Sequence, residues 1–154
     1  MRKRWLTVGV LGLALFAINV VARLVARLAF NGDLAAADRI TLAMLLAVGV
    51  TCLVVATFWA RHHEAARWTA DLSAAALLGL LLAVLVGPFV SGAAPFGDGA
   101  GEFFKQIWQW AGFAIAGAVL GYSIVTALGL DHRSVLLKRF AEAKRAKPRR
   151  VVRR

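Results

Sequence analysis

Polar residues recur along one face of the first hydrophobic segment, and they carry the clearest chemistry in this sequence. Asn19, Arg23, Arg27 and Asn31 follow one another at intervals of four in the stretch NVVARLVARLAFN. On a helix, this spacing places all four side chains on one face. A guanidinium group presents a planar fork of donors that matches a carboxylate or a phosphate. The pattern therefore predicts that Asn19, Arg23 and Arg27 bind an acidic group of a partner or an anion.

A simpler interpretation also fits the two arginines. Arg23 follows 18 uncharged residues, so its long stem can reach the membrane surface from a lipid-facing position, as can that of Arg27. Asn19 lies deeper and is not needed for this arrangement, and a polar residue at that depth favours contact with protein or with a polar ligand. Both interpretations stay open from the sequence alone. The acidic partners that this chain itself offers are Asp33, Asp38 and Glu102.

Four long uncharged blocks must position this polar face. They cover residues of about 5–22, 40–60, 72–90 and 107–130, in a chain that is 60% hydrophobic with a mean hydropathy of +0.71. A helix rises about 1.5 Å per residue, so about 20 residues cross a hydrocarbon core of about 30 Å. Backbone groups in lipid must hydrogen-bond within the segment, so each block is predicted to be a helix. We expect an all-α integral membrane protein, in which residues 1–130 form a four-transmembrane-helix bundle whose first helix continues to residue 30.

The distribution of basic residues predicts the orientation of this bundle. If the N-terminus lies in the cytoplasm, 15 of the 19 Lys and Arg residues lie on the cytoplasmic side, together with four of the eight acidic residues. The other side then holds four basic and four acidic residues, so the basic excess is strongly cytoplasmic. We therefore predict a multi-pass protein of the plasma (inner) membrane with both termini in the cytoplasm. Trp108 and Trp110 are expected at the outer interface, and any self-assembly is expected to be parallel.

The fourth block contains a small-residue motif that suits a close helix contact. Gly117 and Gly121 form a GxxxG pattern, GAVLG, and Gly112 is expected to extend the same packing surface. Small residues let two helix backbones approach closely within a membrane. The sequence does not decide whether the contact is with another chain or with a helix of the same bundle, and both interpretations stay open.

Residues 131–154 are predicted to form a basic, amphipathic or disordered cytoplasmic tail. Its cations are expected to bind the anionic lipids of the inner leaflet, where each Lys or Arg contributes about 1 kcal/mol. The residues predicted for this role are Lys138, Arg139, Lys144, Arg145, Lys147, Arg149 and Arg150. Because the tail is tethered to a membrane, lipid rather than nucleic acid is its expected partner.

Residues that could support catalysis or metal binding are few. His62, His63 and Glu64 are adjacent, so on a helix they point in different directions and cannot converge on one ion. Cys52 is the single cysteine, which excludes an intramolecular disulfide and a thiolate metal cluster. We therefore predict no catalytic residue, no metal and no cofactor.

Together these observations predict a non-enzymatic accessory, assembly or scaffold subunit of a larger membrane complex, in contact with another membrane protein or with copies of itself. The main alternative is a parallel homo-oligomeric small channel or carrier, in which Asn19, Arg23 and Arg27 draw anions to an outer mouth. A third interpretation is a lipid-handling protein whose outward arginines hold a phosphate.

Overall fold

Six helices make up the regular structure of the computed structural model, which describes residues 2–30, 34–92, 94, 96–97 and 99–146. Within these ranges there is no strand. The helices are α1 (Arg2–Ala29), α2 (Leu34–His62), α3 (Ala65–Leu85), α4 (Gly87–Val90), α5 (Ala100–Ala127) and α6 (His132–Ala146). The helices α1, α2, α3 and α5 contain stretches long and apolar enough to cross a membrane, which confirms an all-helical protein with four candidate spans.

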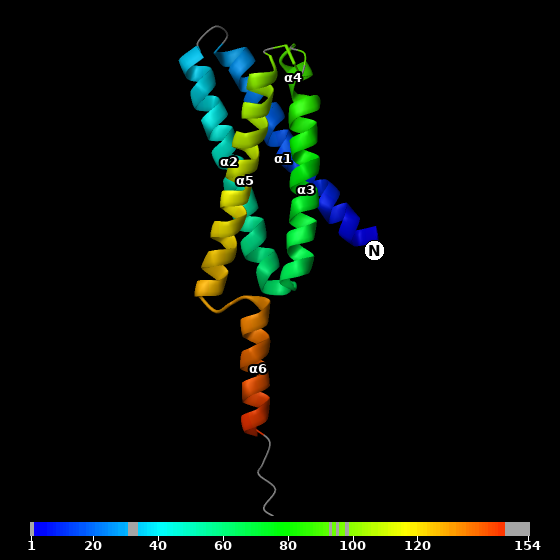
Figure 1. Ribbon diagram of the computed structural model, residues 1–154, viewed down its shortest axis with the longest axis vertical. Coiled ribbons are helices and arrows are strands. Elements are labelled where there is room, and N and C mark those ends of the chain that lie inside the picture. Colours follow the sequence, from blue (N-terminus) through cyan, green and yellow to red (C-terminus); the bar gives the residue numbers. More distant parts are fainter. Residues whose placement is uncertain (1, 31–33, 93, 95, 98, 147–154) are drawn as a thin grey trace, which may run out of the picture.

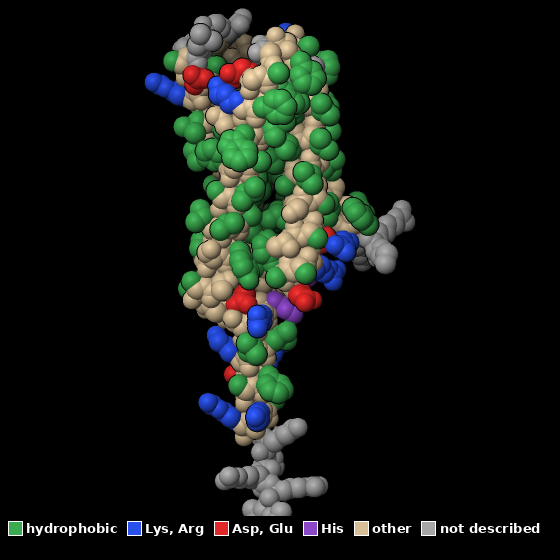
Figure 2. All heavy atoms as spheres, in the orientation of Figure 1, with side chains coloured by type: hydrophobic (Ala, Val, Ile, Leu, Met, Phe, Trp, Pro, Cys, Tyr) green, Lys and Arg blue, Asp and Glu red, His purple; other side chains and the backbone are tan. Residues whose placement is uncertain are grey.

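The four long helices form a bundle whose turns lie at two opposite ends, and α1 crosses the others obliquely so that its N-terminal end projects beyond α3 (Figure 1). At one end, here called the α4 end, the end of α1 lies near α4 and the starts of α2 and α5. At the other, here called the α6 end, α2 turns sharply into α3, and α6 projects along the long axis (Figure 1). Figure 2 shows hydrophobic side chains along the middle of the visible face and charged side chains near both ends, as expected for helices that cross a membrane.

Two helices are displaced relative to the uncharged blocks: α3 ends at Leu85 rather than at 90 and α5 ends at Ala127 rather than at 130, and both begin earlier than predicted. α3 begins at Ala65 rather than at 72, and α5 begins at Ala100 rather than at 107. Both extensions bring charged residues into the helix, because the ends of a membrane helix reach water and tolerate charge there. Asp71, for example, lies inside α3 and forms an ion pair with Arg4 of α1 at 2.5 Å.

The contact between α2 and α5 is the most extensive in the bundle, and glycines allow it. A Cβ atom on Gly117 would overlap the carbonyl oxygen of Gly49, and one on Gly121 would overlap that of Leu53. The GxxxG motif therefore packs against α2 of the same chain. Gly112 does not share this surface, because it is exposed and a Cβ atom there would meet no described atom within 4 Å. Five residues turn a helix by about 500°, which places Gly112 about 140° away from Gly117.

Large apolar side chains fill the core between the helices. Leu15, Val48 and Trp110 are each at most 1% exposed. The expectation that Trp110 lies at the outer membrane interface is therefore wrong, because its ring lies inside the bundle beside Gly79 of α3. Trp108, by contrast, is 82% exposed. Two residues turn a helix by about 200°, so the two tryptophans point in nearly opposite directions.

Candidate functional site

Asn19 lies at the centre of a polar network near the α4 end. Its side chain is only 1% exposed, although it belongs to a helix apolar enough to cross a membrane. Its amide nitrogen Nδ2 donates to Sδ of Met44 on α2 at 3.1 Å, and its Oδ1 accepts from Nε of Arg23 at 3.0 Å. Asn19 and Arg23 therefore lie together, and Asn19 faces protein rather than lipid.

Both arginines tie α1 to the segment around α4. Arg23 donates from a terminal nitrogen to Oγ of Ser91 at 3.3 Å, and Ser91 in turn donates to the carbonyl oxygen of Pro88 at 2.9 Å. Arg27 donates to the carbonyl oxygen of Val90 at 3.1 Å. The C-terminus of a helix leaves carbonyl oxygens without intrahelical partners, so a cation is favourable there. The two arginines thus hold the one-turn helix against α1.

Gly87 allows this contact. It begins α4 after the single residue Val86 that follows α3, and Pro88 supplies the fixed φ of a first helical turn. A Cβ atom on Gly87 would lie 2.7 Å from Oδ1 of Asn19 and 3.0 Å from Nε of Arg23, so a side chain here would push the network apart. Gly87 and Ser91 are not among the residues that the sequence predicts for this site, because 68 positions separate Ser91 from its partner Arg23.

The acidic residues near the arginines have different surroundings. Glu102 pairs with Lys105 of the same helix at 3.2 Å. Asp38 is exposed and borders the same cavity as the arginines, while Asp33 lies outside the described residues. Arg27 is exposed and Arg23 is half-buried. The interpretation in which an arginine side chain extends from a lipid-facing position to the membrane surface therefore fits Arg27 better than Arg23.

A polar cavity of about 840 Å³ lies at the α4 end between α1, α2, α4 and α5, and is here called the α4-end cavity. Its wall carries cations, acids and amides. These polar side chains are Asn19, Arg23, Arg27, Asp38, Glu102, Lys105, Gln106 and Gln109. Toward the middle of the bundle, the buried side chains of Leu15, Val48 and Trp110 fill the space between the helices. The cavity can therefore hold a ligand, but it does not continue as a passage through one chain.

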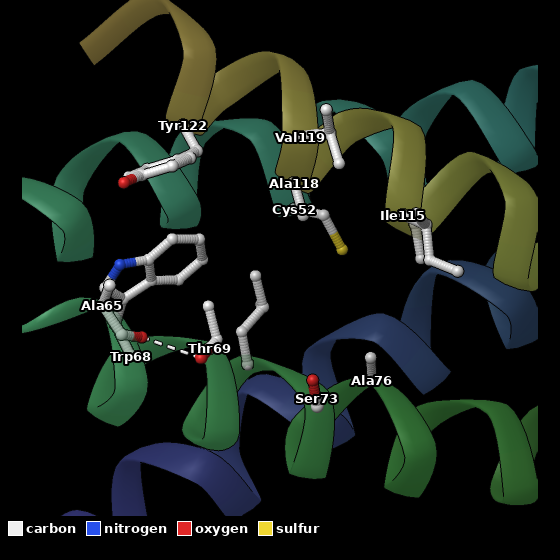
Figure 3. Close-up of a pocket in the computed structure, with 12 residues that line it drawn as sticks. Cys52, Ala65, Trp68, Thr69, Ser73, Ala76, Ile115, Ala118, Val119 and Tyr122 are labelled. Atoms are coloured by element: carbon white, nitrogen blue, oxygen red, sulfur yellow. Dashed lines mark hydrogen bonds between the residues drawn. The ribbon is translucent and has the colours of Figure 1, made fainter. Parts of the chain in front are cut away.

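A second hollow of about 360 Å³ lies between α3 and α5, nearer the α6 end, and is here called the α3–α5 groove (Figure 3). Figure 3 shows Trp68 and Tyr122 on opposite sides of one end, with ring centroids 5.4 Å apart. The sulfur of Cys52 points into the groove from α2 (Figure 3). Most of the other lining side chains are small, and include Ala65, Thr69, Ser73, Ala76, Ala114 and Ala118.

The described part of the tail forms α6, which is largely exposed. Nζ of Lys138 donates to the carbonyl oxygen of Gly129 at 3.3 Å, where the chain leaves α5. Its exposed cations are Arg133, Lys138, Arg139, Lys144 and Arg145, and its large exposed apolar side chains are Leu136, Leu137 and Phe140. The other residues predicted to bind lipid, Lys147, Arg149 and Arg150, lie outside the described residues.

Among the described residues, no group of three or more His, Cys, Asp or Glu side chains is close enough to hold a metal ion. His62 is exposed, and its Nδ1 lies 2.8 Å from the carbonyl oxygen of Phe58. Comparison of the chain with protein-family models, with curated proteins and with solved structures finds no match. The chemistry of the two hollows and of the tail is therefore the basis for a functional proposal.

Proposed function

We propose that this protein is a non-enzymatic accessory, assembly or scaffold subunit of a larger membrane complex, and that the α3–α5 groove receives a transmembrane helix of another membrane protein. The observation that carries this proposal is the groove itself, a hollow between helices apolar enough to cross a membrane, in which alanine, serine and threonine make up half of the lining residues. Lipid gives helices no hydrophobic drive to associate. Helix contacts in membranes therefore depend on close packing of small residues and on hydrogen bonds.

The groove offers both kinds of contact. Ala76 and Ala118 border it with single methyl groups, so a partner backbone can approach closely. Ser73 and Thr69 add hydroxyl groups, and that of Thr69 donates to the carbonyl oxygen of Ala65 at 2.7 Å (Figure 3). A hydroxyl oxygen still accepts when it donates, so a polar group of a partner helix can bind here.

The glycine motif of α5 supports the choice of this surface. Gly117 and Gly121 are packed against α2, so they are not offered to another chain. The exposed face of α2 instead carries branched aliphatic side chains such as Val50 and Val54, which suit contact with lipid. In the described part of the chain, the α3–α5 groove is therefore the surface that best suits a partner helix.

The proposed orientation has both termini in the cytoplasm and the α4 end on the outer side of the plasma (inner) membrane. The charge distribution supports it, because 15 of the 19 Lys and Arg residues then lie in the cytoplasm. α6 projects along the long axis of the bundle (Figure 1), so its cations and the exposed Leu136, Leu137 and Phe140 would meet an anionic leaflet once α6 turns onto the cytoplasmic surface. The expected partner of the tail is thus lipid and not nucleic acid.

A parallel homo-oligomeric small channel or carrier is the second candidate, and the α4-end cavity is the observation that favours it. Arg23 and Arg27 border the cavity and would attract anions. The packed side chains of Leu15 and Val48 lie between this cavity and the α6 end. Transport would therefore require a passage between chains.

Photocrosslinking from the groove tests the proposed contact. A photoreactive phenylalanine analogue at Ser73 is expected to trap a discrete product of higher mass, because this side chain borders the groove. The same analogue at Val54 is the control, since Val54 is 57% exposed on α2 and borders neither hollow. The measurement is irradiation of cells at native expression levels, followed by identification of the crosslinked product.

The identity of the product separates the candidates. Another membrane protein crosslinked from Ser73 but not from Val54 supports the subunit role. A product that contains only copies of this chain supports the homo-oligomer. Equal labelling of lipid from both positions would show that the groove faces the bilayer and contacts no partner helix.

A further inference from the structure

The α4-end cavity presents charges of opposite sign on different helices. Arg23 and Arg27 border it from α1, and Asp38 borders it from α2. The other two charged side chains, Lys105 and Glu102, are paired on α5 at 3.2 Å and so contribute little net charge. A ligand in this cavity therefore meets a cationic wall and a separate acidic group.

The cationic wall is fixed by the protein itself. Arg23 is bonded to Asn19 and Ser91 at 3.0 and 3.3 Å, and Arg27 to the carbonyl oxygen of Val90 at 3.1 Å. Guanidinium groups that are already held in place lose little freedom when a ligand binds. Their planar arrangement of donors matches the oxygens of a phosphate.

Apolar side chains also border the cavity. Phe30, Leu42 and Phe103 line it, and Leu42 is 52% exposed on a helix apolar enough to cross a membrane. The polar part of a ligand can therefore lie in the cavity while an attached hydrocarbon chain remains in the bilayer. This combination fits a phospholipid better than a free inorganic anion.

We propose that the α4-end cavity binds a phosphoester that carries a primary ammonium group, as in the headgroup of phosphatidylethanolamine. The phosphate meets Arg23 and Arg27, and the ammonium group meets Asp38. An anionic headgroup without an amine leaves Asp38 without a partner. A quaternary ammonium group has no N–H to donate to it. This site is separate from the α3–α5 groove, so the proposal does not rest on the subunit role.

Lipid binding by the purified full chain tests this proposal. Native mass spectrometry measures the binding of phosphatidylethanolamine, phosphatidylglycerol and phosphatidylcholine, each added alone. We expect phosphatidylethanolamine to bind about tenfold more tightly than the other two, because it alone brings a phosphate to Arg23 and Arg27 and an ammonium N–H donor to Asp38. Asp38→Asn is expected to lower its binding to the level of phosphatidylglycerol, and Arg27→Gln to weaken the binding of both lipids.

Arg39→Gln is the matched control, because Arg39 is exposed beside Asp38 and does not border the cavity. It should leave the binding of all three lipids unchanged. Asp38 and Arg27 are also exposed, so their variants are expected to fold. Displacement of the lipid by soluble phosphoethanolamine would identify the headgroup alone as the ligand, and retention would identify the whole lipid. Equal binding of the three lipids, or an Asp38→Asn variant that binds phosphatidylethanolamine like the parent protein, overturns the proposal.

Discussion

Gly117→Ile is expected to prevent the bundle from assembling. The new side chain would overlap the carbonyl oxygen of Gly49, so α2 and α5 would have to separate. Extra atoms in a packed core usually cost about 1–3 kcal/mol, and here the obstacle is backbone that cannot rotate away, so we expect a loss of at least about 3 kcal/mol. The yield of monodisperse protein in mild detergent and its thermal unfolding measure the effect.

Gly112→Ile is the matched control on the same helix. Gly112 is exposed, and a Cβ atom there would meet no described atom within 4 Å, so this variant should assemble like the parent protein. Gly121→Ile should resemble Gly117→Ile, because it would overlap the carbonyl oxygen of Leu53. If Gly117→Ile instead assembles normally, α5 does not make the close contact with α2 that is described above for Gly117.

Arg23→Ala is expected to destabilise the protein by about 1–3 kcal/mol, the cost of leaving a buried polar group without its partner. The buried Asn19 would lose the donor that satisfies its Oδ1, and Ser91 would lose its link to α1. Arg23→Lys should rescue poorly, because an ammonium group lacks the planar fork that reaches both partners. The shift in thermal unfolding midpoint in detergent is the measurement.

Arg27→Ala is the control for this network. Arg27 is exposed and donates to a single described backbone carbonyl, that of Val90, so its loss should cost less than about 1 kcal/mol. A larger loss of stability in Arg23→Ala than in Arg27→Ala would therefore support the network around Asn19. Unfolding midpoints of Arg23→Ala and Arg27→Ala that both match the parent protein would show that the arginines only reach for the membrane surface.

Local spacing predicts the part of the site that lies on one helix. Asn19 and Arg23 are four residues apart, and one helical turn brings their side chains into contact. The same reasoning cannot identify Ser91 or Val90 as partners, because they lie more than 60 positions away, and only the path of the chain through α3 and α4 brings them to α1.

The helices themselves follow from length and hydropathy, but the contacts between them do not. The GxxxG pattern of Gly117 and Gly121 predicts a close approach without naming the partner, since any helix with a small residue can fit there. The α3–α5 groove depends on how far α3 and α5 diverge, and hydropathy carries no information about that separation. Trp110 is a case in which the sequence suggests the wrong surroundings. Membrane interfaces and protein cores both favour tryptophan, and only the packing of the helices shows that Trp110 lies in the core.

Purification in mild detergent from cells at native expression levels tests the subunit role most directly, with every co-purifying chain identified. We predict that a second, larger membrane protein is recovered in a fixed ratio, and that Ala118→Trp abolishes its recovery by filling the groove. Recovery of a homogeneous assembly that contains only this chain, unchanged by Ala118→Trp, would contradict the subunit role and favour the homo-oligomeric channel or carrier.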